Sequence, residues 1–139
     1  ACEYLARYSF SSHAGHRRDV VPFGWGVASP AHAVWMKGRQ ESRGILPTSV
    51  SFCQIDTTNV IVLTFKRAED GRGHILRLLE TSGRGTAATV SLPYLCFNQV
   101  WITNLVEEDG YCLSNAGPSL TVTIKPYAIT TLRLLETSD

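Results

Sequence analysis

The feature that most constrains this chain is an alternation of apolar and polar residues from residue 49 onward. In the segment 119–124, Leu120, Val122 and Ile124 share one parity, while Ser and Thr occupy the other. This period of two is typical of a strand with one buried face and one solvent-facing face. A sheet made of such strands must bury its apolar face against a second layer.

The same kind of segment recurs along the chain, and we predict further strands over 59–66, 74–80, 86–92, 98–104 and 129–135. Turn-forming stretches such as 69–71, 82–85, 108–110 and 115–118 separate them. The segment 59–66 is apolar on both parities, which favours a central strand covered on both sides. Short strands punctuated by turns predict an all-β fold, an antiparallel β-sandwich.

The N-terminal third is less regular. The segments 3–12 and 33–36 predict two further strands, and 37–47 predicts an exposed loop. Between them, Pro22, Gly24 and Gly26 weaken any helix over 19–29, so we expect an irregular or short-helix segment there. A length of 139 residues suits a single β-sandwich domain over residues 1–139, with 1–48 as its divergent N-terminal part.

One heptapeptide occurs twice. Leu-Arg-Leu-Leu-Glu-Thr-Ser stands at 76–82 and again, letter for letter, at 132–138. The flanking residues do not repeat, so we do not infer two structural repeats. We predict that both copies are strands that bury alternate leucines.

Charge excludes some partners. The chain has 13 basic and 12 acidic residues and a formal net charge of +1, without the run of like charges that a nucleic-acid-binding arm needs. Its apolar runs are far shorter than the ~20 residues of a membrane-spanning helix. We therefore predict neither a nucleic acid nor a membrane as partner.

The cysteines bear on location. Cys2, Cys53, Cys96 and Cys112 include no C-x-x-C pair, which argues against a zinc knuckle or a redox motif. Free thiols in a reducing compartment are the first interpretation, and a Cys96–Cys112 disulfide is the alternative. The residues from Ala1 onward show no signal-peptide pattern, although the chain lacks an initiator Met and an upstream signal stays open. The expected location is cytoplasmic.

One cluster has residue types that ligate metals. His13, His16 and Asp19 lie three apart and would converge on zinc if the backbone formed one helical turn. The alternative is a loop at the end of a strand, with His13 hydrogen-bonded to neighbouring backbone. Most acidic residues stand beside glycine in turns, and no Ser occupies a G-x-S-x-G motif. We therefore predict no catalytic residue in this chain.

Tryptophans offer a second kind of site. Sugar rings stack on exposed Trp or Tyr faces in many sandwiches, and Trp101 shares its parity with the polar Gln99 and Thr103. Trp25 lies in the irregular N-terminal third. Both are candidate carbohydrate-binding residues, although a core or a domain interface uses tryptophan equally well.

A longer ordered set of residues is more specific. Asn59 to Leu63, then Ala68-Glu69-Asp70-Gly71, Gly73, Ile75 to Leu78, Glu80 and Gly83, and later Asn104-Leu105, Glu107-Glu108, Lys125-Pro126 and Ile129 to Leu134 keep a characteristic order and spacing. The set, over roughly residues 45–135, resembles the C-terminal β-domain of glycoside hydrolase family 38, the zinc-dependent α-mannosidases. The first 44 residues match it weakly, since His13-Ala14-Gly15-His16 and Phe23-Gly24-Trp25-Gly26 depart from the family pattern.

The resemblance implies a non-catalytic role. The family's zinc ligands and nucleophile belong to a catalytic domain that this chain does not contain, so no cofactor is expected here and zinc is expected in that domain. The leading hypothesis is a sandwich that packs against, or shapes, a catalytic α-mannosidase domain in the same or a separate chain. The alternative is a free-standing module that binds mannose-containing glycans. A small zinc enzyme built on His13, His16 and Asp19 is the third hypothesis.

Overall fold

Strands dominate the structure, a computed structural model that describes residues 3, 5–6, 8–15, 20–35, 46–113 and 117–136. The chain divides into two units, residues 1–44 and 45–139, which we describe separately. In the first unit the described residues form one helix, α1 (Val20–Ala28). In the second they form β1 (Gln54–Ile55), β2 (Val60–Arg67), β3 (His74–Glu80), β4 (Thr86–Ser91), β5 (Phe97–Thr103), β6 (Asp109–Cys112), β7 (Ser119–Ile124) and β8 (Ile129–Glu136).

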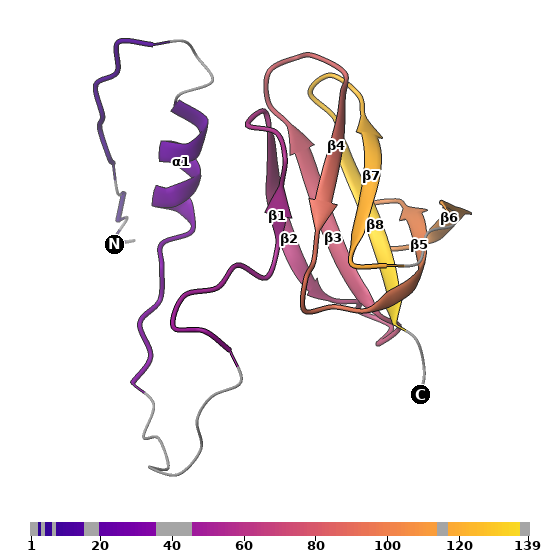
Figure 1. Cartoon of the computed structure of the whole chain (residues 1–139). Coiled ribbons are helices and arrows are strands. Elements are labelled where there is room, and N and C mark those ends of the chain that lie inside the picture. The colour runs from indigo at the N-terminus through magenta and orange to yellow at the C-terminus, as the bar shows by residue number, and fades with distance from the viewer. Residues whose placement is uncertain are drawn as a thin grey trace. The chain divides into compact units, whose positions relative to one another are not determined.

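The strands make two antiparallel sheets (Figure 1), one of three strands in the order β1-β4-β7 and one of five in the order β2-β3-β8-β5-β6. The alternate apolar residues of β4 and β7 face those of the larger sheet. Thus Val90 and Leu120 pair across β4 and β7, and both are buried. The resulting core consists of Val60, Leu76, Leu78, Ala88, Val90, Leu92, Phe97, Val100, Leu120, Val122, Ile124, Leu132 and Leu134. The prediction of an antiparallel β-sandwich is confirmed.

The two copies of the heptapeptide are neighbours in the larger sheet. Leu76 of β3 and Leu132 of β8 are direct cross-strand partners, and both are fully buried. Leu78 and Leu134 are also fully buried, so each copy contributes alternate leucines to the core, as predicted.

The prediction of a central strand over 59–66 is wrong. β2 is an edge strand of the five-stranded sheet, and most of its residues are half-buried. The central strand is β8, in which residues 131–134 are all buried although Thr131 and Arg133 are polar. Apolar content on both parities did not identify the centre, because loops 68–73 and 104–108 supply polar partners for the outer face of β8.

Two short strands were missed. β1 has two residues, too few for a periodic pattern, and β6 begins within the segment 108–110 that we predicted as a turn. At Gly110, β6 lies so close to β5 that a Cβ would stand only 2.9 Å from the carbonyl oxygen of Ile102. Glycine suits this strand position because it has no side chain to clash there.

The N-terminal predictions fare differently. The described residues within 3–12 and 33–35 are not in strands, so both strand predictions are wrong there. The alternation in 3–12 lacked a partner strand, and unpaired strands are unstable in water. The short-helix expectation is confirmed by α1, whose Pro22 lies in the first turn, where a missing N–H is tolerated. Within the loop predicted over 37–47, only 46–47 are described, and they are neither helix nor strand.

Candidate functional site

The most elaborate polar arrangement lies on the outer face of the five-stranded sheet, around Arg133 of β8. Its guanidinium is almost fully buried, and its Nε and Nη1 donate to Asp109 Oδ1 at 2.6 Å and to Asp70 Oδ1 at 2.8 Å. Nη1 and Nη2 also donate to the carbonyl oxygens of Arg72 (2.8 Å) and Glu107 (2.6 Å). The hydrogen bond from Arg133, and after it the one from the Arg72 N–H, lowers the pKa of the Asp70 carboxyl, so Asp70 and Arg133 both stay charged. Arg133 thereby fixes loops 68–73 and 104–108 to the sheet.

Glu107 extends this arrangement. It is 8 % exposed, and its Oε2 accepts from the backbone N–H of Glu69 at 2.8 Å, while Oε1 lies 2.9 Å from Lys66 Nζ and 3.4 Å from Arg77 Nη2. The hydrogen bond from the Glu69 N–H, and to a smaller extent the one from Lys66, holds the pKa of the Glu107 carboxyl below its ordinary value. The backbone of Glu107 has φ 68°, a conformation unusual for a residue with a side chain. The hydrogen bonds and ion pairs offset that strain and hold the loop in one shape.

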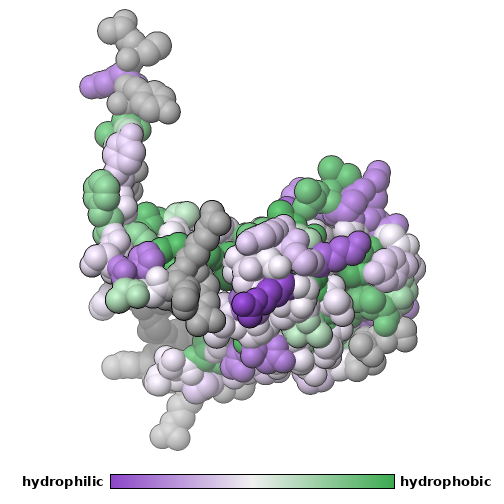
Figure 2. All heavy atoms as spheres, turned by 90° about the horizontal axis from the view of Figure 1, so that it is seen from above, coloured by the Kyte–Doolittle hydropathy of each residue, from purple (hydrophilic) through white to green (hydrophobic). Residues whose placement is uncertain are grey.

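The loop 104–108 presents two aliphatic side chains to solvent. Asn104 Oδ1 accepts from the N–H groups of Val106 (3.0 Å) and Glu108 (2.9 Å), and Arg77 Nη2 donates to the carbonyl oxygen of Leu105 at 2.8 Å. Leu105 is 59 % exposed and Val106 75 % exposed. Adjacent apolar side chains that a hydrogen-bonded loop holds in water form a candidate contact surface for another protein. Figure 2 shows hydrophobic residues, in green, at the surface among polar ones.

A second buried carboxylate lies where β3 ends. Glu80 is fully buried and accepts hydrogen bonds from the N–H groups of Ser82 (2.8 Å), Gly83 (2.8 Å), Arg84 (3.2 Å) and Tyr127 (3.0 Å). The Ser82 hydroxyl and the Asn59 amide also donate to it. Burial opposes ionisation, but these donors outweigh it and lower the pKa of Glu80 from 4.5 to about 2. Glu80 thus joins the 82–84 turn to the β7–β8 turn as a carboxylate that is ionised at neutral pH.

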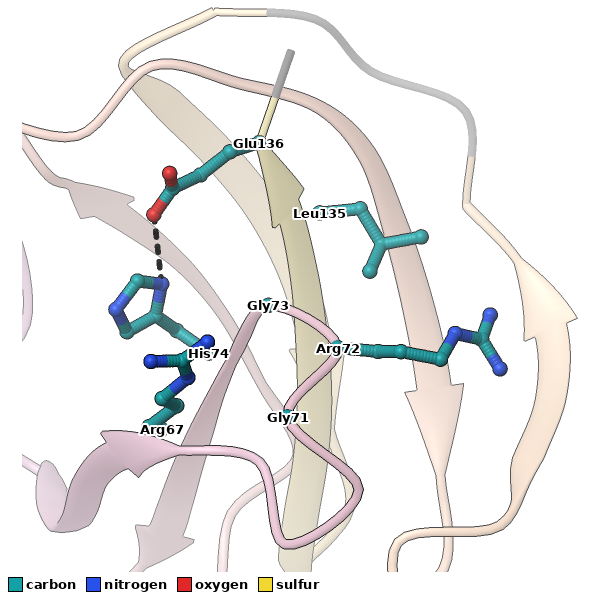
Figure 3. Close-up of a pocket in the computed structure, with 7 residues that line it drawn as sticks. All are labelled: Arg67, Gly71, Arg72, Gly73, His74, Leu135 and Glu136. Atoms are coloured by element: carbon teal, nitrogen blue, oxygen red, sulfur yellow. Dashed lines mark ion pairs between the residues drawn. The ribbon is translucent and has the colours of Figure 1, made fainter. Parts of the chain in front are cut away.

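A cavity of about 490 Å³ lies at the hairpin between β2 and β3, and Figure 3 shows the residues that line it. It is lined by Arg67, Gly71, Arg72, Gly73, His74, Leu135 and Glu136. His74 Nδ1 lies 3.0 Å from Glu136 Oε1, without the alignment of a hydrogen bond. A Cβ at Gly73 would stand 2.1 Å from the carbonyl oxygen of Leu134, so only glycine lets the hairpin lie against β8 there.

The sequence-predicted sugar-binding residues belong to different units. Trp101 is half-buried on the outer face of the larger sheet, opposite Arg133 on one side and Cys112 on the other. Its Nε1 donates to Gln99 Oε1 at 3.4 Å. Trp25 lies on α1 and is 37 % exposed. Carbohydrate binding by either residue stays a prediction.

Of the metal candidates, His13 is exposed, whereas His16 and Asp19 lie outside the described residues. The described part of the chain holds no cluster of three or more His, Cys, Asp or Glu side chains fit to bind a metal ion.

The alternative of a Cys96–Cys112 disulfide is wrong, because the thiol of Cys96 is free and exposed. Cys53 is half-buried, which raises the pKa of its thiol. Cys2 lies outside the described residues.

Sequence reasoning assigned no role to the residues that organise these sites, namely Asp70, Glu80, Glu107, Asp109 and Arg133. The sequence pattern placed Asp70 and Asp109 beside glycine in turns and Glu80 at the end of a predicted strand, and it indicated no buried partner for them. One signal was available, because Arg133 occupies a strand position whose neighbours at 132 and 134 are core leucines. An arginine there requires acidic residues from distant turns if the strand is central.

Comparison with known proteins identifies the family to which this sandwich belongs. The model of the glycosyl hydrolases family 38 C-terminal beta sandwich domain matches residues 59–132, more than half of the chain. This chain belongs to that family, which confirms the resemblance drawn from sequence.

Searches of curated proteins and of solved structures gave no significant match. Among the described residues, no helix has the length and apolar character needed to cross a membrane.

Proposed function

We propose that this chain is the non-catalytic C-terminal sandwich of an α-mannosidase of family 38, and that it packs against a catalytic domain. The observation that carries the proposal is the loop 104–108, whose rigid frame exposes Leu105 and Val106. This loop lies inside the segment that matches the family. A catalytic domain seated on it would remove both aliphatic side chains from water, at about 25 cal/mol per Å² of apolar area.

The ionisation of three carboxylates supports the proposal that this chain is non-catalytic. A glycosidase needs one carboxyl group that carries a proton near neutral pH, together with a second carboxylate at a fixed separation. Glu80, Glu107 and Asp70 instead have pKa values below their ordinary range, and each is engaged by donors that hold loops in place. Such groups are poor proton donors to a leaving oxygen, and their hydrogen bonds serve the fold.

The test starts from the coding sequence around this chain, where we expect a family 38 catalytic domain in frame or in an adjacent gene. The two regions, produced together, are expected to co-purify in a 1:1 ratio. Replacing Leu105 and Val106 together by Asp should abolish co-purification. Thr123→Asp, an exposed change on the outer face of the smaller sheet, is the matched control and should leave it intact.

Absence of any such coding region, or equal co-purification of the Leu105/Val106 double variant, would contradict the proposal. Saturable binding of a neutral mannoside by the chain alone, lost on Trp101→Ala, would instead favour the free-standing carbohydrate-binding module.

A further inference from the structure

The cavity at the β2–β3 hairpin has a charge distribution that neither the core nor the loops explain. Arg67, His74 and Glu136 occupy inner-face positions of the larger sheet, in line with the core residues Leu76 and Leu134. Unlike those leucines, Arg67 and Glu136 are exposed and His74 is only half-buried. The apolar inner face therefore ends in three ionisable side chains that line an open cavity.

Two arginines line the cavity, and their side chains extend on opposite sides of the hairpin. Figure 3 shows Arg67 with His74 and Glu136 on one side of the hairpin, and Arg72 with Leu135 on the other. Within the described part of the chain, no carboxylate pairs with Arg67, and Arg72 Nη2 lies 3.7 Å from the nearer oxygen of its partner Asp109. Asp109 itself is engaged at 2.6 Å by Arg133. Arg67 is therefore the guanidinium that remains available to a ligand in the cavity.

The floor of the cavity is held in place. Gly71 and Gly73 have φ values of +76° and +71°, and the Ala68 N–H donates to the Gly73 carbonyl oxygen at 3.0 Å. Arg133 binds the carbonyl oxygen of Arg72 at 2.8 Å, which ties this turn to the centre of the sheet. A preformed floor lowers the conformational entropy that the protein loses when a ligand binds.

We propose that this cavity binds a small ligand that carries a carboxylate or a phosphate group. A guanidinium presents parallel N–H donors that match the two oxygens of such an oxyanion. The Nδ1 of His74 is buried against Glu136 Oε1, whereas Glu136 is exposed and offers acceptor oxygens to hydroxyl groups of the same ligand. Leu135 adds an apolar surface for carbon atoms. An acidic sugar and a free inorganic oxyanion share the chemistry that the Arg67 guanidinium recognises.

The experiment is a titration of the full chain, labelled with ¹⁵N, at low ionic strength. The probes are inorganic phosphate, glucuronate and neutral mannose. We expect saturable shifts at residues 67–74 and 135–136 with phosphate or glucuronate, and none with mannose. A tighter response to glucuronate identifies an acidic sugar, and an equal response identifies the oxyanion alone.

The variant Arg67→Gln should weaken binding about tenfold, the effect of one charge-assisted hydrogen bond. Arg84→Gln removes one exposed arginine at the distant β3–β4 turn and should change affinity less than about twofold. An equal loss in both variants would mean general charge attraction and would overturn the proposal. Equal shifts with mannose, or no saturable shift with any probe, would also overturn it.

This test needs no catalytic partner, and Leu105 and Val106 do not line the cavity. Loss of oxyanion binding therefore leaves the proposed docking role standing, and failure of docking leaves the cavity proposal standing.

Discussion

The two identical heptapeptides, 76–82 and 132–138, meet opposite electrostatic surroundings in the same sheet. Arg77 in β3 keeps 22 % of its side chain exposed and contacts one carboxylate, while Arg133 in β8 keeps 2 % and contacts two. The glutamates reverse this order, since Glu80 is fully buried and Glu136 is exposed. The loops that cover each strand, rather than the local sequence, decide which charge is buried.

The largest expected effect separates the two glutamates. Glu80→Gln should lower the free energy of unfolding by about 3 kcal/mol, because the amide cannot accept from all the N–H groups that now bind the carboxylate. Glu136→Gln, its counterpart in the second copy, should change it by less than about 0.5 kcal/mol. Urea unfolding at pH 7 measures both. Similar losses in the two variants would refute the contrast.

Lowering the pH should also distinguish Glu80 from Glu136. The pKa of Glu80 falls from 4.5 in the unfolded chain to about 2 in the fold, so its contribution is complete above pH 4.5 and is lost as pH falls toward 2. Glu107 and Asp70 have lowered pKa values as well. The wild type and Glu136→Gln should therefore lose stability between pH 4.5 and 2, and Glu80→Gln should lose less over that range. Parallel pH curves for all three proteins would contradict the role of Glu80.

The arginines should differ by a smaller margin. Arg133→Met leaves Asp70 and Asp109 without their shared partner and should cost about 2–3 kcal/mol, toward the lower end for a broken buried pair because both carboxylates can rehydrate. Arg77→Met should cost about 1 kcal/mol, since Lys66 still pairs with Glu107. The measurement is again urea unfolding at neutral pH. A greater loss for Arg77→Met would reverse the proposed roles.

The β2–β3 hairpin tests how the loop reaches Arg133. Gly73→Ala adds both a positive-φ strain and a clash with the Leu134 carbonyl, and should cost about 2 kcal/mol. Gly71→Ala adds the strain alone, because nothing lies within 4 Å of a Cβ there, and should cost about 1 kcal/mol. Thermal unfolding ranks the two. If Gly71→Ala were the more damaging, the close approach of the hairpin to β8 would not matter.

The smallest effect belongs to the exposed loop. Replacing Leu105 and Val106 by Asp should change stability by less than about 0.5 kcal/mol, because Arg77 binds the Leu105 carbonyl and not its side chain. Circular dichroism on heating measures this. A large loss would mean that the two side chains serve the fold.

The sandwich was predictable because apolar and polar residues alternate along most of its strands, and this alternation is visible in the sequence. The segments 74–80 and 119–124 match β3 and β7 residue for residue, and β8 extends one residue beyond its prediction. The charged sites were not predictable, because their partners come from distant parts of the chain. Asp70 and Arg133 are 63 residues apart, and Tyr127 and Glu80 are 47 apart. No local pattern shows which turn folds over which strand.

The most direct test of the account is a hydrolysis assay of the purified chain with an aryl α-mannoside, in the presence of added zinc. We predict no product above the rate in buffer alone, because its buried carboxylates are held ionised for folding. Zinc-dependent turnover that co-elutes with the chain and disappears in a carboxylate variant that remains folded would contradict it.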